Sequence, residues 1–254
     1  MEQLLWLCLA AFAAGFIDAI VGGGGLVQTP ATLVVLPQHP VATLLGTVKI
    51  PSFAGTFIAA INYARRVTIN IKLVVLVAII AFAASFVGSS LAASLDNKVF
   101  KPIILVILIG VAIYTYSNKG FGLQLKGSAP SRLKILLALV LALIIGFYDG
   151  FIGPGTGSFL VLLFIAVLGN DFLHASAHAK IVNLATNLAS IIYFGSTGHI
   201  LYQYAVPMAA CNVFGSFVGS WLALRKGNTF IRGFFLFVVI ATMARFAWDI
   251  FKSW

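Results

Sequence analysis

The sequence predicts an all-α polytopic membrane protein built from two inverted repeats of about five helical elements each, with short broken helices after two glycine clusters. The first observation behind this prediction is the composition. Of 254 residues, 16 are Lys or Arg and 6 are Asp or Glu, so 9% are charged, whereas 61% are hydrophobic. A soluble domain carries about 25% charged residues. The composition therefore excludes a soluble globular protein, a disordered chain and a secreted disulfide scaffold.

The second observation is a series of long apolar runs. A helix needs about 20 apolar residues to cross the hydrocarbon core of a bilayer, and most of the runs are this long. Two shorter runs each follow a glycine cluster, at 26–37 and 157–169. The long runs cover residues 3–21, 43–64, 70–94, 99–117, 132–152, 175–195, 201–224 and 231–251.

The third observation is an internal repeat, because the two halves align without a gap at an offset of 131 positions. Apolar matches are common in so hydrophobic a chain, but matched acids, bases and glycines at one offset indicate a duplicated unit. We expect a first transmembrane repeat over 1–117, a cytoplasmic linker over 118–131 and a second repeat over 132–254. The matched pairs include Asp18 with Asp149, Gly22 with Gly153, Gly24 with Gly155, and Lys49 with Lys180.

The loop charges predict that the two repeats are inverted. The loop after the third run of the first half carries Arg65, Arg66 and Lys72, whereas its equivalent at 196–203 has no Lys or Arg. Basic loops stay cytoplasmic, so equivalent loops face opposite sides. Counting the short runs as crossings gives ten, with both termini outside. If the short runs are re-entrant instead, there are eight crossings, and the basic loop 225–232 falls on the wrong side.

Four ionisable residues lie well inside apolar runs, namely Asp18, Lys49, Asp149 and Lys180. A charge at the centre of a membrane helix costs about 2.5–3.5 kcal/mol, so such residues usually face the bundle interior and often mark a transport pathway. The structural alternative is that these acids and bases form pairs that only hold helices together.

The glycine clusters predict broken helices at membrane depth. Irregular backbone survives there only where it lines a cavity or is buried in protein. The short helix that follows each cluster points its N–H groups, with their partial positive charge, at an anion. Helix packing is the alternative role for these glycines. The predicted substrate-binding residues of the clusters are Gly22, Gly23, Gly24, Gly25, Gly153, Gly155, Thr156 and Gly157.

The helices that contain the two lysines add further substrate-binding candidates. Lys180, Asn183 and Asn187 share one helical face, and Lys49 and Ser52 share the equivalent face of the first half. A lysine with amide or hydroxyl groups beside it suits an oxyanion. Polar contacts between helices are the alternative interpretation.

Three residues are candidates for coupling transport to charge movement. Asp18 and Asp149 each lie one helical turn before a glycine cluster. Either carboxylate can neutralise a lysine or take up a proton, and the sequence does not choose between these roles. His178 is a candidate proton carrier, although its repeat partner is Thr47.

Other function classes find little support in the sequence. It contains no phosphate loop of the form GxxxxGK[ST], no HExxH and no GxSxG. His174 and His178 are four residues apart, but no Glu lies between them, so we expect no enzyme, metal or cofactor. The scattered basic residues also argue against nucleic-acid binding. The lysines oppose a cation transporter or channel that would use the aspartates as ligands. A transporter or channel for a cation or for another small organic anion remains the alternative.

The segment GFIDAIVGGGGLVQTP at 15–30, with its echo GFYDGFIGPGTGSF at 146–159, resembles the sulfite exporter TauE/SafE family of membrane permeases. The resemblance spans nearly the whole chain. It implies secondary transport of small sulfur-containing anions, such as sulfite or organosulfonates, across a prokaryotic inner membrane. The particular anion, the direction and the coupling ion stay open. Gly215 and Gly219 form a small-xxx-small pattern that is compatible with a homodimer.

Overall fold

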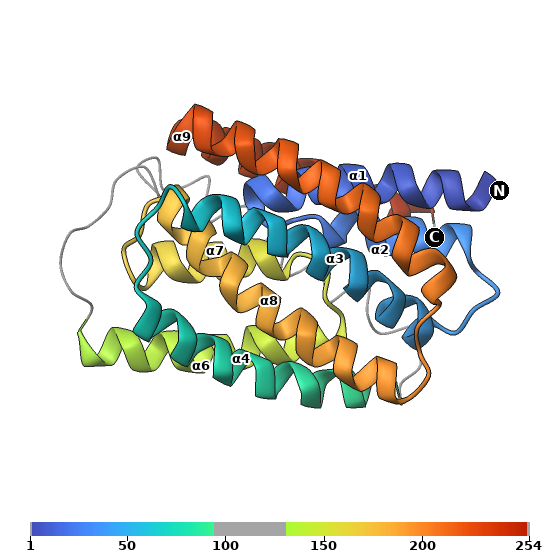
Figure 1. Ribbon diagram of the computed structural model, residues 1–254, viewed down its shortest axis with the longest axis horizontal. Coiled ribbons are helices and arrows are strands. Elements are labelled where there is room, and N and C mark those ends of the chain that lie inside the picture. Colours follow the sequence, from blue (N-terminus) through green and yellow to red (C-terminus); the bar gives the residue numbers. More distant parts are fainter. Residues whose placement is uncertain (1, 94–130, 253–254) are drawn as a thin grey trace.

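The computed structural model describes residues 2–93 and 131–252, which are almost entirely helical and contain no strand (Figure 1). The expected run 99–117 and most of the expected linker lie outside the described residues. The helices are α1 (Glu2–Val21), α2 (Gly25–Val35), α3 (Val41–Ala64), α4 (Ile71–Ala92), α6 (Arg132–Phe151), α7 (Thr156–Ala166), α8 (Phe172–Ser196) and α9 (Tyr202–Lys252).

The predicted apolar runs reappear as helices, and each helix from α1 to α8 begins and ends within about three residues of its run. The exception is α9, which joins the two predicted runs 201–224 and 231–251. Gly227 interrupts it with φ 74° and ψ −167°, so α9 consists of two helices joined at a kink. Left-handed φ values are easily adopted only by glycine, and the break therefore falls where the sequence placed its polar gap.

The bundle exposes large apolar side chains on its outer surface and buries polar ones within it, as expected of a protein whose solvent is lipid. Five of the described helices are long and apolar enough to cross a membrane: α1, α3, α4, α6 and the part of α9 before Val238. Leu5, Ile79 and Phe214 are each at least 60% exposed. Helix α8 has 25 residues but is more polar, and its polar side chains, including Lys180 and Asn187, are buried in the bundle.

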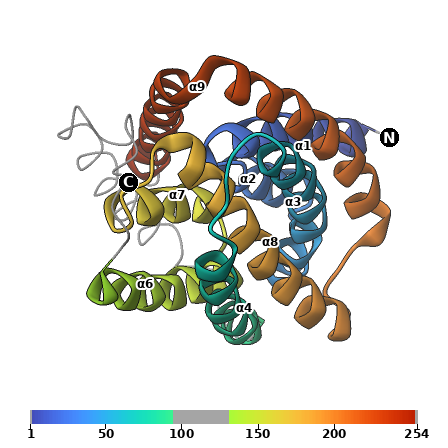
Figure 2. The ribbon, with the colours of Figure 1, turned by 60° about the vertical axis from the view of Figure 1, so that its left-hand side comes forward.

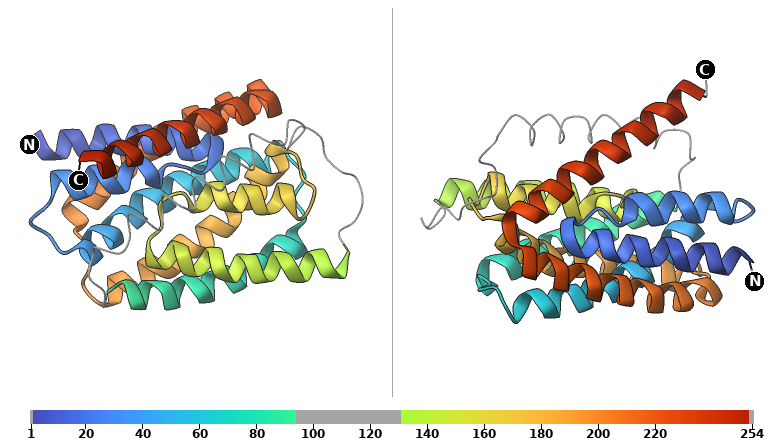
Figure 3. Two further views of the ribbon diagram at one scale, coloured as in Figure 1. Left: turned by 180° about the vertical axis from the view of Figure 1, so that it is seen from behind. Right: turned by 90° about the horizontal axis from the view of Figure 1, so that it is seen from above.

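Each half of the chain packs against the other half through the equivalent helices (Figures 2 and 3). Helix α1 packs along α9, as α6 packs along α4, while α3 and α8 meet in the centre. The closest contacts between helices follow the same pattern. Gly15 lies against the backbone of Asn212, and Gly146 lies against the backbone of Ala81. Both pairs are related by the offset of 131 positions, so the repeat in the sequence is a repeat in the packing.

The central helices α3 and α8 run antiparallel. Gly46, near the start of α3, lies against Phe194 near the end of α8. At the other end, the backbone N–H of Asn70, just after α3, donates to the Nε2 of His178 near the start of α8. Figure 1 likewise shows α1 and α6 running in opposite directions. Inverted repeats would give antiparallel pairs of this kind, and the inversion itself stays a prediction.

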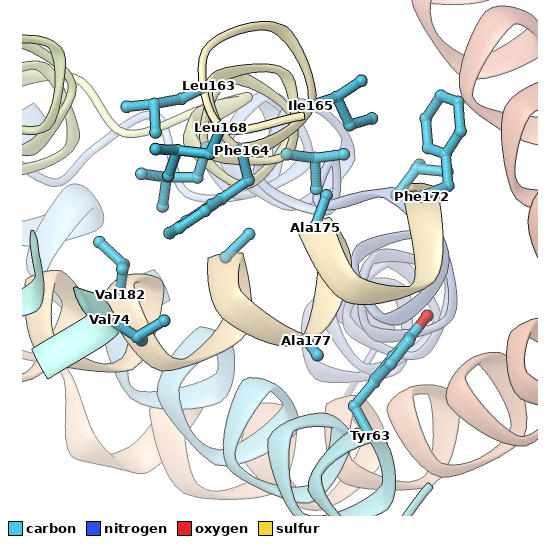
Figure 4. Packing of buried hydrophobic residues seen from close by; sticks show 14 of the residues in the cluster. Tyr63, Val74, Leu163, Phe164, Ile165, Leu168, Phe172, Ala175, Ala177 and Val182 are labelled. Atoms are coloured by element: carbon cyan, nitrogen blue, oxygen red, sulfur yellow. The ribbon is translucent and has the colours of Figure 1, made fainter. Parts of the chain in front are cut away.

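The largest core cluster surrounds the short helix α7 and the first half of α8 (Figure 4). Phe164, Phe172 and Val182 are fully buried there, and the hydroxyl of Tyr63 donates to the carbonyl oxygen of Ala19 at 3.1 Å. Nine of the eleven residues of α7 are buried. This short helix is therefore enclosed by protein, which is the condition under which a broken helix is tolerated inside a membrane.

Candidate functional site

The two glycine clusters meet in the middle of the bundle. Helix α1 ends at Val21 and α6 ends at Phe151, and each is followed by a short turn before the next helix. The N–H of Ser158 donates to the carbonyl oxygen of Gly22 at 3.1 Å, and the Ser158 hydroxyl donates to that of Val21 at 3.0 Å. A side chain at Gly157 would overlap the backbone of Gly22. Only glycine permits this contact between the two halves.

The short helices α2 and α7 begin at this contact. Each has 11 residues, a length of roughly 16 Å. Their N-cap residues, Gly24 and Gly155, provide no side-chain cap, whereas Asn70, Ser131 and Asp171 cap α4, α6 and α8. The partial positive charge of these two helix starts is therefore not neutralised by a capping side chain.

Each buried lysine pairs with the aspartate of the opposite half. The Nζ of Lys49 lies 3.1 Å from Oδ1 of Asp149, and the Nζ of Lys180 lies 3.0 Å from Oδ2 of Asp18. The two pairs are related by the repeat. The four charges sum to zero, so the centre of the bundle is electrically neutral while both pairs are formed.

The lysines also cap the C-terminal ends of α1 and α6. Lys49 Nζ donates to the backbone carbonyl of Asp149 at 2.6 Å, and Lys180 Nζ donates to that of Asp18. Both carbonyls belong to the last turn of a helix, where the macrodipole favours a cation. Each ammonium group therefore bonds one carboxylate and one helix end.

The two pairs differ in the groups around the carboxylate. Thr56 donates its hydroxyl to Oδ2 of Asp18 at 3.2 Å, and the Asp18 side chain is 15% exposed. The Asp149 side chain is 3% exposed, and no described residue donates a hydrogen bond to its Oδ2. Asp149 is thus the less well satisfied of the two acids.

A small cavity of about 30 Å³ lies among these groups. A cavity needs about 10–15 Å³ to hold one water molecule, so this space has room for about two or three. Most of the predicted site residues line it. They are Gly22, Gly25, Lys49, Ser52, Gly153, Gly155, Thr156, Gly157, Asn183 and Asn187, together with the coupling candidates Asp18 and Asp149.

The asparagines form a polar ladder along the cavity wall. The side-chain amide of Asn187 donates to the backbone carbonyl of Asn183 at 2.8 Å and to its Oδ1 at 2.9 Å. Both side chains are buried, and both reach the cavity from one face of α8. The helical spacing had predicted this shared face.

Four predicted residues do not line the cavity. Lys180 is instead held by Asp18, while Gly23 lies near Val238 and Gly24 lies against Ala14.

His178 is the fourth, and it lies near the start of α8. Its Nε2 accepts from the backbone of Asn70, and its Nδ1 lies 2.7 Å from Nδ2 of Asn170. The structure gives it no contact with either aspartate. Among the described residues, no group of three or more His, Cys, Asp or Glu side chains is placed to hold a metal ion.

The cavity also contains residues that the sequence did not single out. Thr29, Val48 and Ile152 line it. Thr29 lies one helical turn after Gly25, and a polar residue in the short apolar run 26–37 was the signal available in the sequence. Val48 and Ile152 are ordinary apolar residues, so only the packing identifies them.

Comparison with known proteins gives the family. The family model for the sulfite exporter TauE/SafE matches residues 7–246. A probable membrane transporter protein of Haemophilus influenzae is 33% identical over 98% of this chain and 96% of its own length. The probable membrane transporter protein ORF9 of a Sinorhizobium species is 36% identical, with 97% and 93% coverage.

A third relative, the probable membrane transporter protein YfcA of Escherichia coli K12, is 32% identical over 96% of this chain and 89% of its own length. No solved structure matches the chain. The family match and these relatives cover both halves of the bundle, including both glycine clusters and both ion pairs. The chain is a membrane protein that belongs to the sulfite exporter TauE/SafE family.

Proposed function

We propose that this protein is a secondary transporter for small sulfur-containing anions, such as sulfite or an organosulfonate, in a bacterial inner membrane. The family and its relatives support a membrane transporter. In this proposal the two halves move against each other around the central cavity, which opens alternately to the two sides.

The observation that carries the proposal is the crosswise pairing of lysines and aspartates at the contact of the two glycine clusters. An oxyanion that enters the cavity competes with the carboxylates for Lys49 and Lys180. The starts of α2 and α7 and the amide of Asn187 supply further donors. Because each ion pair joins the two halves, replacing a carboxylate by substrate loosens the contact that holds them together.

The small volume of the cavity fits a state in which the binding site is contracted. About 30 Å³ accommodates a few water molecules but not an organosulfonate. Binding therefore requires the walls to separate, and movement between the halves provides the space. A site that must open to bind and close around its ligand is what alternating access requires.

Charge balance suggests that a proton accompanies the anion. The four buried charges sum to zero, so a bound anion leaves a net negative charge in a medium of low dielectric constant. Protonation of one carboxylate restores neutrality for a monoanion. Asp149 is the favoured acceptor, because its Oδ2 has no hydrogen-bond donor among the described residues.

The alternative is a cation transporter that uses Asp18 and Asp149 as ligands. Both carboxylates already bind a lysine, and a cation would have to displace an ammonium group while remaining beside it. The geometry therefore favours the anion.

A ligand screen by thermal shift tests the proposed substrate class. The purified protein is heated with sulfite, sulfate, thiosulfate, taurine or sulfoacetate, each as the sodium salt, at two pH values. A ligand at 100 times its Kd stabilises the folded state by about 2.7 kcal/mol. We expect at least one of the sulfur compounds to raise the Tm well above the shift given by sodium chloride. Equal shifts for all salts would contradict the proposal.

A further inference from the structure

A second and much larger cavity lies where α3 ends beside the middle of α9. Its volume is about 620 Å³, and it shares no lining residue with the central cavity. Asn62 of α3 bonds Ser220 of α9 at 2.8 Å and fixes the two helices at this point. Nothing in the proposed transport cycle uses this space.

Three arginines are among the residues that line this cavity, namely Arg65, Arg66 and Arg225. All three residues are exposed, and no carboxylate of the described residues lies within ion-pair distance of them. Arg225 lies over the ring of Trp221, 5.2 Å from its centre. Asp171 precedes the lining residue Leu173 by two positions. Its carboxylate oxygens, however, accept hydrogen bonds from the backbone N–H of His174 and the side-chain amide of Asn228. Within the part of the chain that the structure describes, the positive charge of this cavity is therefore not compensated by a carboxylate.

Apart from Asn62, the rest of the cavity wall is apolar and aromatic. Phe217 and Trp221 lie one helical turn apart on α9 and are 55% and 51% exposed, and Leu173 and Leu224 also line the cavity. Trp rings are enriched where a helix passes from hydrocarbon to headgroups. The cavity thus combines a cationic end with a lipid-facing aromatic wall.

The repeat provides an internal comparison at the other end of the bundle. The positions equivalent to Phe217 and Asn62 are Phe86 and Tyr193, whose rings pack edge to face with centroids 5.5 Å apart. Arg65 and Arg66 correspond to Ser196 and Thr197, and Trp221 corresponds to Ser90. Arg65 and Arg66 therefore have no basic counterpart at the equivalent described positions, as a ligand confined to one leaflet would require.

We propose that this cavity binds the phosphate headgroup of an anionic phospholipid, with an acyl chain along Phe217 and Trp221. Basic pockets between transmembrane helices suit such headgroups, and guanidinium groups bind phosphate through paired hydrogen bonds. A free inorganic anion would use the arginines but would gain nothing from the exposed aromatic wall. The combination of both features favours the lipid.

Native mass spectrometry of the delipidated protein with added phosphatidylglycerol or phosphatidylcholine tests this proposal. We expect preferential retention of phosphatidylglycerol. The triple variant Arg65→Gln, Arg66→Gln, Arg225→Gln should bind it roughly 100-fold more weakly, given the usual contribution of each arginine near a lipid surface. The matched control replaces three other exposed cations, Lys72, Arg132 and Lys134, by Gln and should stay within about threefold of the wild type.

Equal weakening in the two triple variants would overturn the proposal, since binding would then follow overall charge. Inorganic phosphate that displaces phosphatidylglycerol at equal concentration would also overturn it, because the site would then be one for a free anion.

A second measurement does not depend on the folding of the arginine variant. Phosphatidylglycerol with brominated acyl chains should quench tryptophan fluorescence in the wild type more than in Trp221→Phe. Equal quenching of the two proteins would contradict the predicted acyl-chain position.

Discussion

At the scale of single residues, the central feature is that each buried lysine binds an aspartate far away in the chain. Lys49 and Asp149 are 100 positions apart, and Lys180 and Asp18 are 162 apart. The sequence identified all four residues, because charges within apolar runs are rare and costly. It did not say which acid meets which base, since pairing within a half and pairing across the halves fit the same repeat.

The difference between the two acids leads to a prediction about coupling. If Asp149 carries the proton, Asp149→Asn should bind the anion but lose the pH dependence of transport. The matched variant Asp18→Asn should retain it, because the carboxylate of Asp149 is unchanged. Transport by both variants in liposomes, measured with and without a pH gradient, checks this. An unaltered pH dependence in Asp149→Asn would exclude the proposed proton site.

At the scale of elements, the glycine clusters made the two broken helices predictable. Glycine releases the backbone from a helix, and both breaks fall at these clusters. The kink at Gly227 was likewise marked by the polar gap between two runs. The contact between the breaks was not predictable, because it depends on which helices neighbour each other.

The contact of Gly157 with Gly22 should be sensitive to a single methyl group. Gly157→Ala would push a Cβ into the backbone of Gly22, and overpacking of this kind costs about 1–3 kcal/mol. Gly233→Ala is the control, since a Cβ there meets nothing within 4 Å. Thermal unfolding in detergent should show a clear loss of stability for Gly157→Ala and little change for Gly233→Ala. Equal stability of the two variants would argue against this contact.

At the scale of the whole molecule, the number, length and order of the described helices followed from apolar runs and one repeat offset. The packing did not. Membrane helices lack the one-sided apolar stripe that shows which face of a soluble helix is buried, and they associate through small residues and local fit. That α1 lies along α9, with Gly15 against Asn212, is therefore a result of the structure alone.

The proposed inverted topology makes a prediction about sidedness. Thr68 and Thr197 are both exposed, and they lie in the α3–α4 and α8–α9 loops, respectively. These equivalent loops lie at opposite ends of the bundle (Figure 1). In a variant with Cys8 and Cys211 replaced by Ser, a cysteine at Thr197 should react with a membrane-impermeant maleimide added to intact cells. A cysteine at Thr68 should react only after the cells are opened. Labelling of both from the outside would contradict the topology.

The central claim is that the two buried lysines hold the transported anion, and uptake of sulfite into proteoliposomes tests it most directly. The informative variant is Lys180→Met with Asp18→Asn, because removing both charges leaves no buried carboxylate without its partner. Losing a buried charge contact costs about 2 kcal/mol or more, so we predict at least roughly 30-fold slower uptake at low sulfite in a protein that still folds. The control Lys72→Met, at an exposed position, should transport like the wild type. Wild-type uptake by the folded double variant would contradict the account.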